Sequence, residues 1–232
     1  MSAIKPALML LVTVSIMFLL CKLKYNNYST KFYILQLKRI NLRKKEQNLA
    51  MEIMSFDFKS ENFSVCIAKT LENYLISPFE SIIFLFVGSD SNIGDSLAPI
   101  CGSLFDCEGS GVFAYGSLIF PITAKEVPFA VEFIKKAHPD SLIVAIDAAI
   151  GKSSDVGLVK VQKSGIKPGL GVDKDLPEVG DLSVIGILGE KKGGKALFTV
   201  NKISVVYKMA EKIAEGLKIF VENNQKRLKF CK

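Results

Sequence analysis

Ile82-Ile83-Phe84-Leu85-Phe86-Val87 is an uninterrupted apolar run that ends at Gly88. A strand with one face in water alternates apolar and polar residues, so a continuous apolar run indicates a strand covered on both faces. A second run of this kind, Leu-Ile-Val-Ala-Ile, occupies residues 142–146. Strands buried on both faces are typical of parallel sheets whose two sides are covered by helices. These two runs therefore predict an α/β domain.

The segments around these strands alternate between helical and extended patterns. Apolar residues recur every three or four positions at 63–76 and again from Ile203 to Phe220, which predicts amphipathic helices. Strands that alternate with helices predict a three-layer αβα fold around a mostly parallel sheet, here over residues 63–232. The other predicted elements are helices at 95–105 and 125–137 and strands at 112–115, 158–162 and 182–188.

The N-terminal part of the chain has a different composition. Residues 6–21 carry no charge, and residues 22–50 hold eight Lys or Arg against one Glu. As a helix the apolar stretch would span about 24 Å, and the positive charge after it would stay in the cytoplasm. This pattern predicts a single-pass membrane protein with a transmembrane anchor at residues 1–23.

Residues 24–62 are then expected to form a basic linker or a surface helix. A second interpretation is that translation starts at Met51 or Met54, in which case the protein is cytoplasmic and lacks the anchor.

Charge and cysteine content exclude several classes of site. The formal net charge is +7, but outside residues 22–50 the chain is nearly neutral, so we expect no nucleic-acid groove in the domain. The five cysteines are scattered without a Cys-x-x-Cys pair, and His138 is the only histidine. This pattern argues against a disulfide framework, a zinc site and a multi-histidine metal site. We therefore predict no cofactor.

Two aspartates follow the two apolar runs. Asp147 comes directly after the strand 142–146, and Asp95 ends the polar loop that follows Val87. Because sites in α/β sheets gather at the carboxyl ends of the strands, both carboxyl groups would face one crevice if the strands are neighbours. Two close carboxylates resist double ionisation, so they share a proton and act as acid and base, as in aspartic proteolysis.

Structural roles are also open to these residues. Asp95 can be the N-cap of the helix that follows it, and Asp147 can form a turn. Asp90, Asp173 and Asp181 are further acids that either join the site or are solvated.

Four segments, in this order, resemble the YyaC-like family of sporulation proteins. They are Val87–Pro99 (V-G-S-D-S-N-I-G-D-S-L-A-P), Tyr115–Lys125, Ala145–Gly151 (A-I-D-A-A-I-G) and Ile166–Asp181. The same segments are similar to motifs of the germination protease of spore-formers, whose two proposed catalytic aspartates match Asp95 and Asp147.

The resemblance implies a phosphorylase/hydrolase-like fold, shared with hydrogenase maturation endopeptidases. It implies an aspartic-type endopeptidase of sporulation or germination with Asp95 and Asp147 as catalytic pair. Its substrate would be a protein or peptide, such as small acid-soluble spore proteins. The substrate cleft is expected to involve Gly88, Ser89, Asp90, Ser96 and Lys174.

Two further expectations accompany the resemblance. Hydrogenase maturation endopeptidases sense nickel with a Glu, an Asp and a His, whereas Ser96 stands near the Glu position here and the corresponding downstream loop has no His. We therefore expect no metal. The alternative to a peptidase is a non-catalytic sporulation factor that keeps the fold as a binding module, and a homo-oligomer stays open in both cases.

Overall fold

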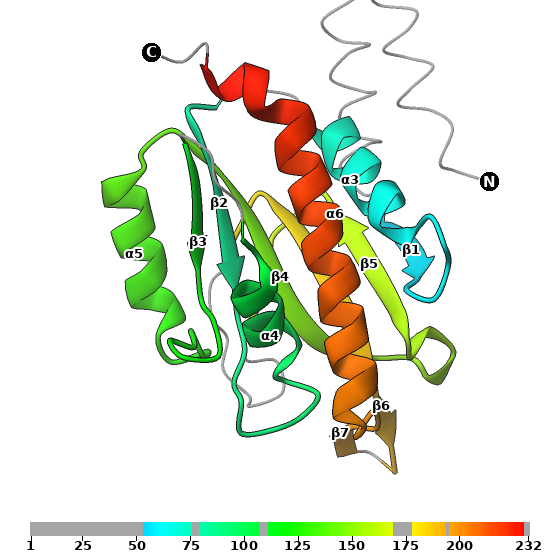
Figure 1. Ribbon diagram of the computed structural model, residues 1–232. Coiled ribbons are helices and arrows are strands. Elements are labelled where there is room, and N and C mark those ends of the chain that lie inside the picture. Colours follow the sequence, from blue (N-terminus) through cyan, green and yellow to red (C-terminus); the bar gives the residue numbers. More distant parts are fainter. Residues whose placement is uncertain (1–52, 76–78, 107–110, 169–177, 194, 230–232) are drawn as a thin grey trace, which may run out of the picture. The chain divides into compact units, whose positions relative to one another are not determined.

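A seven-stranded sheet forms the centre of the computed structural model (Figure 1). The structure describes residues 53–75, 79–106, 111–168, 178–193 and 195–229. They belong to a structural unit that covers Ala50–Lys232.

The strand order in the sheet is β1-β5-β6-β4-β2-β3, and β7 pairs with β6. Parallel pairing joins β3, β2, β4 and β6, whereas β5 and β7 run against their neighbours. The predicted α/β class and mostly parallel sheet are confirmed. The strands are β1 (Ile53–Asp57), β2 (Ser81–Phe86), β3 (Val112–Tyr115), β4 (Ser141–Gly151), β5 (Leu158–Gln162), β6 (Leu182–Lys192) and β7 (Lys195–Phe198).

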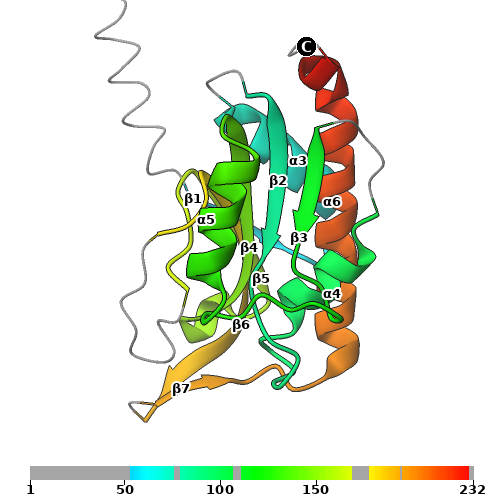
Figure 2. The same cartoon turned by 90° about the vertical axis from the view of Figure 1, so that its left-hand side faces the viewer.

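Helices cover both faces of the sheet, as Figures 1 and 2 show from two sides. One core cluster joins α3, α4 and α6 to one face, and a second cluster joins Val127 and Ile134 of α5 to the other. The strand β2 contributes Phe84 and Phe86 to the first cluster and Leu85 to the second, which explains its continuous apolar sequence. The helices are α3 (Phe63–Tyr74), α4 (Leu97–Leu104), α5 (Val127–Ala137) and α6 (Ile203–Lys229).

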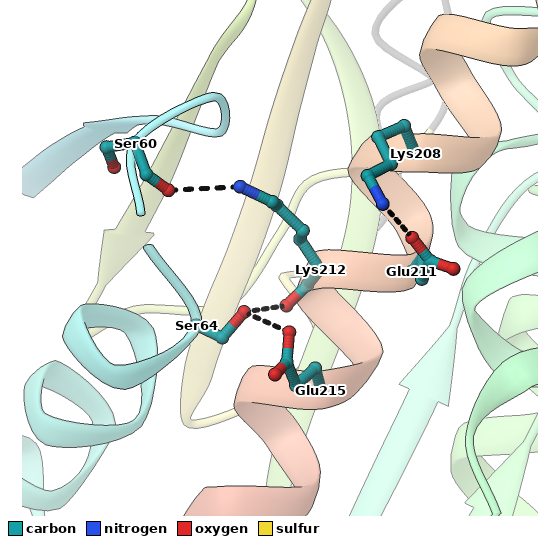
Figure 3. A network of polar contacts seen from close by, with 6 residues as sticks. All are labelled: Ser60, Ser64, Lys208, Glu211, Lys212 and Glu215. Carbon is teal, nitrogen blue, oxygen red and sulfur yellow. Dashed lines mark hydrogen bonds and ion pairs between the residues drawn. The ribbon is translucent and has the colours of Figure 1, made fainter. Parts of the chain in front are cut away.

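Polar contacts fix the start of α3 against α6 (Figure 3). The Ser64 hydroxyl lies 2.9 Å from the Lys212 carbonyl oxygen and 2.9 Å from Glu215 Oε2. The Lys212 ammonium donates back to the Ser60 carbonyl at 3.0 Å. These contacts complement the apolar packing of the two helices and fix how α3 is placed along α6.

The structure adds elements that the sequence patterns did not predict. The strand β1 pairs antiparallel with β5, although its residues fall within the predicted linker 24–62. The strand β7 forms a hairpin with β6. In addition, β4 does not stop before Asp147 but continues beside β6 to Gly151.

The location predicted from the N-terminal sequence is contradicted. In the part of the chain that the structure describes, no helix is both long and apolar enough to cross a membrane. The long helix α6 carries Lys and Glu along its exposed side, among them Lys208, Glu211 and Glu215, and packs its apolar side on the sheet. By this finding, the prediction of a single-pass membrane protein is wrong. Residues 6–21, on which it rested, lie outside the described residues, as does most of the predicted linker.

Candidate active site

Asp147 lies where β4 parts from β2. The parallel pairing of these strands ends at Phe86 and Ile146, and the Val87 N–H still donates to the Ile146 carbonyl at 2.9 Å. Beyond this point β6 is the one strand among the described residues that still pairs with β4, with Asp147 opposite Ile185. The helix after β2 covers one face of the sheet and the helix before β4 covers the other. This is the topological switch point at which α/β folds place their sites.

The strand register decides on which face Asp147 lies. Ile146 and Ala148 belong to the core under α6, and Ala145 belongs to the core under α5. Because side chains alternate along a strand, Asp147 lies on the α5 side of the sheet. The residue is half-buried, so part of it stays in contact with solvent.

The loop after β2 brings Asp95 to the same end of the sheet. The Gly88 N–H donates to the Ile122 carbonyl at 3.0 Å, and the Ser89 N–H donates to the Asp95 carbonyl at 3.3 Å. A Cβ atom on Gly88 would lie 2.3 Å from that Asp95 oxygen and 2.9 Å from Pro99 Cδ. Only glycine permits so close an approach, so Gly88 supports the loop rather than contributing a reactive group.

Asp95 does not cap the helix that follows it. The N-cap of α4 is Ser96, and no side-chain capping bond is made there. The Ser96 hydroxyl instead donates to the Ile93 carbonyl at 2.7 Å, inside the loop. The structure therefore does not support a capping role for Asp95, and helix capping does not explain why its carboxyl group is half-buried.

The two carboxyl groups affect each other electrostatically. The pKa of Asp147 is raised to about 8: burial is the largest cause, the Ala148 N–H opposes it by donating at 2.7 Å, and the negative charge of Asp95 adds to the rise. Burial also raises the pKa of Asp95, while a hydrogen bond from the Ser89 backbone opposes that shift. The two residues, from distant parts of the chain, thus lie within electrostatic range, and Asp147 stays largely protonated at neutral pH.

The other predicted site residues have different surroundings. The Ser89 hydroxyl lies 2.6 Å from that of Ser91, and Asp90 is exposed. Asp181 accepts the Ile143 N–H at 2.8 Å and so extends the pairing of β4. Lys174 and Asp173 lie outside the described residues.

Two neighbours of the site were not singled out from the sequence. Ile122 forms an isolated bridge with Val87 and so borders the loop of Asp95, although its sequence context predicts only a loop. Lys160 lies opposite Ile185 on the same face as Asp147, two strands away. Its ammonium is held at 2.6 Å by Asp155. In β5 the buried Val159 and Val161 alternate with partly buried residues, Lys160 among them, so no signal in the sequence singles out Lys160.

Metal-binding groups were sought among all the residues described. Within that part of the chain, no group of three or more His, Cys, Asp or Glu side chains is placed to hold an ion.

Comparison with known proteins identifies the family. The family model described as "Protein of unknown function (DUF1256)" matches residues 55–216, more than half of the chain. The chain belongs to this family. A curated relative of this chain is the "Uncharacterized protein YyaC" of Bacillus subtilis (strain 168), 35% identical over 141 residues that cover 60% of this chain and 68% of that protein. The YyaC-like resemblance drawn from the four motifs is thereby confirmed.

Among solved structures, this DUF1256 chain is similar to the NiFe hydrogenase maturation protease HycI from Thermococcus kodakarensis KOD1. The two share 17% identity with a TM-score of 0.41, and the match covers 68% of this chain and 98% of that one.

Proposed function

We propose that the protein is an aspartic-type endopeptidase in which Asp95 and Asp147 share one proton. The observation that supports this most is the position of Asp147, half-buried at the switch point with a pKa of about 8 to which the charge of Asp95 contributes. A carboxyl group that stays protonated at neutral pH can donate a proton. A neighbour that stays ionised can accept one.

The two environments assign the roles. Asp147 is the acid, since it keeps its proton up to about pH 8. Asp95 is the base: burial raises its pKa, but the hydrogen bond from the Ser89 backbone opposes that rise and favours the charged form. Asp95 takes a proton from water while the water oxygen bonds to the peptide carbonyl carbon, and Asp147 gives its proton to the carbonyl oxygen. The C–N bond then breaks, the nitrogen leaves with the proton held by Asp95, and Asp147 recovers its own from the hydroxyl.

The substrate class follows from this chemistry and from the motifs. Water activated by a carboxylate pair hydrolyses an amide without a covalent intermediate, which suits a polypeptide. The resemblance to the germination protease makes small acid-soluble spore proteins the first substrates to assay.

The test replaces each acid with its amide. Asp95→Asn and Asp147→Asn should each lower the cleavage rate by about a hundredfold or more, as expected when a general acid or base is removed. Asp140→Asn is the matched control, because Asp140 is exposed and precedes β4, at the start of the strand and away from Asp147. Cleavage at the wild-type rate by both site variants would reject the mechanism. Loss of cleavage in the control as well would mean that the loss in the site variants is not specific to the carboxylate pair.

A non-catalytic binding module gives a different result. No cleavage by the wild type, together with equal substrate binding by wild type and both Asn variants, would leave the fold with a binding role only.

A further inference from the structure

A strip of apolar side chains lies exposed at the β3 end of the sheet. Ile119, Phe120 and Phe129 are 80%, 78% and 76% exposed, and Phe133 is 57% exposed. Such a strip is larger than the scattered apolar residues of an ordinary surface. The strip comprises Phe113, Leu118, Ile119, Phe120, Phe129 and Phe133.

The strip is held in place by contacts within the domain. The Tyr115 and Phe133 rings meet edge to face at 5.9 Å, which joins β3 to α5. Phe129 lies one helical turn before Phe133 and so shares its side of the helix. The turn that carries Ile119 and Phe120 is fixed by the Ser117 N–H, which donates to the Phe120 carbonyl at 3.1 Å.

The outer edge of β3 adds backbone groups to this strip. β3 is the last strand in the sheet order, so among the described residues only β2 pairs with it. The Ile82 N–H donates to the Gly111 carbonyl at 2.8 Å. Because backbone groups alternate in direction along a parallel ladder, the N–H and C=O groups of Val112 and Ala114 then point away from β2, to the outer edge. The sequence Val-Phe-Ala-Tyr has none of the charges or prolines that protect sheet edges. Figure 2 views the molecule from this side, with β3 and α5 nearest.

The area of the strip fits an interface between folded chains. At about 200 Å² for a large side chain, its exposed surface is on the order of 700 Å². A standard interface buries about 800 Å² on each partner, and weak contacts bury less. A short peptide would leave much of this surface open.

We propose that a second copy of this chain covers the strip through antiparallel pairing of the two β3 strands. A two-fold axis perpendicular to the sheet makes the contact isologous and continues the sheet across both copies. Rotation about this axis does not exchange the two faces of the sheet. Both α5 helices therefore lie on the same face of the continuous sheet, and their aromatic residues meet across the axis. The ion pair of Glu132 with Lys136 at 2.7 Å balances two of the charges on α5, and Lys135 adds one positive charge in each copy. This pairing does not depend on the proposed peptidase activity.

The test measures the mass of the full chain in solution by light scattering over a range of concentrations. Wild type should reach twice the 25.5 kDa of one chain. Phe133→Glu should raise the dimer dissociation constant by roughly tenfold or more, and Phe129→Glu with Phe133→Glu should give a monomer with unchanged circular dichroism. Ile203→Glu is the control, since Ile203 is 53% exposed at the start of α6 and lies outside the strip. It should keep the wild-type mass.

Amide hydrogen exchange gives a readout that needs no variant. Exchange at Val112 and Ala114 should slow as the protein concentration rises, because their N–H groups become paired. A wild-type monomer at all concentrations would overturn the proposal. A dimer that the Phe129 and Phe133 variants leave intact, or exchange at β3 independent of concentration, would overturn it as well.

Discussion

Asp147 lies one residue beyond the last β2–β4 pair, and the charge of Asp95, on the loop that leaves β2 there, raises its pKa. The relationship depends on the parallel pairing of two strands from separate βα units. Burial at the sheet would by itself make Asp147 a weak acid. The charge of Asp95 adds to that effect, and a protonated acid beside a second carboxyl group is what the proposed mechanism requires.

The shared proton predicts how hydrolysis depends on pH. Activity needs Asp147 protonated and Asp95 ionised, so kcat/KM should follow a bell-shaped curve. Its alkaline limb should have a midpoint near 8, the pKa of Asp147, and its acid limb should lie above the ordinary 3.8 because the pKa of Asp95 is raised. Initial rates on a polypeptide substrate between pH 3 and 10 measure both limbs. Activity that keeps rising above pH 9 is incompatible with Asp147 as the acid.

Asp147→Asn should change how folding stability depends on pH. The pKa of Asp147 is about 8 in the folded state against 3.8 for an ordinary Asp, so between these values the folded state holds a proton that the unfolded chain has released. Rising pH therefore favours unfolding over this interval. The Asn side chain does not ionise. The free energy of unfolding of the variant should therefore equal that of wild type near pH 4 and exceed it by about 2 kcal/mol at pH 8, after allowance for partial exposure.

Denaturant unfolding at several pH values measures this difference. It should grow from pH 4 to 8 and stay constant above 8. A stability difference that is the same at all these values would mean that Asp147 titrates normally.

Gly88→Ala should displace the loop that carries Asp95. The new Cβ would stand 2.3 Å from the Asp95 carbonyl oxygen, which belongs to backbone and cannot rotate away. We expect about 2 kcal/mol lower stability, and an activity loss of about tenfold or more because the base moves. Thermal unfolding and cleavage rates check the two effects.

Gly193→Ala is the matched control for this variant. Gly193 also has a positive φ, of 58°, but a Cβ there meets nothing within 4 Å. Gly193→Ala should lower the free energy of unfolding by about 1 kcal/mol and leave the cleavage rate unchanged. Equal effects of the two variants on activity would contradict a special role for Gly88.

Asp181→Ala should lower stability without affecting the chemistry. Asp181 accepts the Ile143 N–H and donates its own N–H to the Ile143 carbonyl, each at 2.8 Å. Removing the carboxylate should cost about 1 kcal/mol in the free energy of unfolding, while kcat/KM stays at the wild-type value. Asp90→Ala, at an exposed position, should change stability by less than about 0.5 kcal/mol. An activity loss in Asp181→Ala at a temperature where the variant is folded would place this acid in the site.

The central strands and the carboxylate pair were predictable because their signals are local. Every residue of β2 is buried, and after Ser81 its sequence is apolar throughout. The apolar residues of α6 recur with the helical period because one side packs on the sheet. The positions of Asp95 and Asp147 after two buried strands then follow from the rule for parallel sheets.

The elements that were missed depend on partners far away in the chain. Most of β1 is exposed, so Ile53–Asp57 has no clear alternation, and its pairing is set by β5 about a hundred residues later. The continuation of β4 through Asp147 depends on β6, which offers pairing partners as far as Glu190. Asp181 looked like a spare acid because its acceptor role appears only when β4 and β6 are aligned. No local pattern carries these relationships.

Carboxyl carbon NMR of Asp147, followed through a pH titration in wild type and in Asp95→Asn, tests the shared proton most directly. The account predicts a midpoint near 8 in wild type. In Asp95→Asn the midpoint should fall, because the charge of the neighbour is gone, but it should stay above 3.8 because burial remains. A wild-type midpoint near 3.8, or one that Asp95→Asn leaves unchanged, would contradict the account.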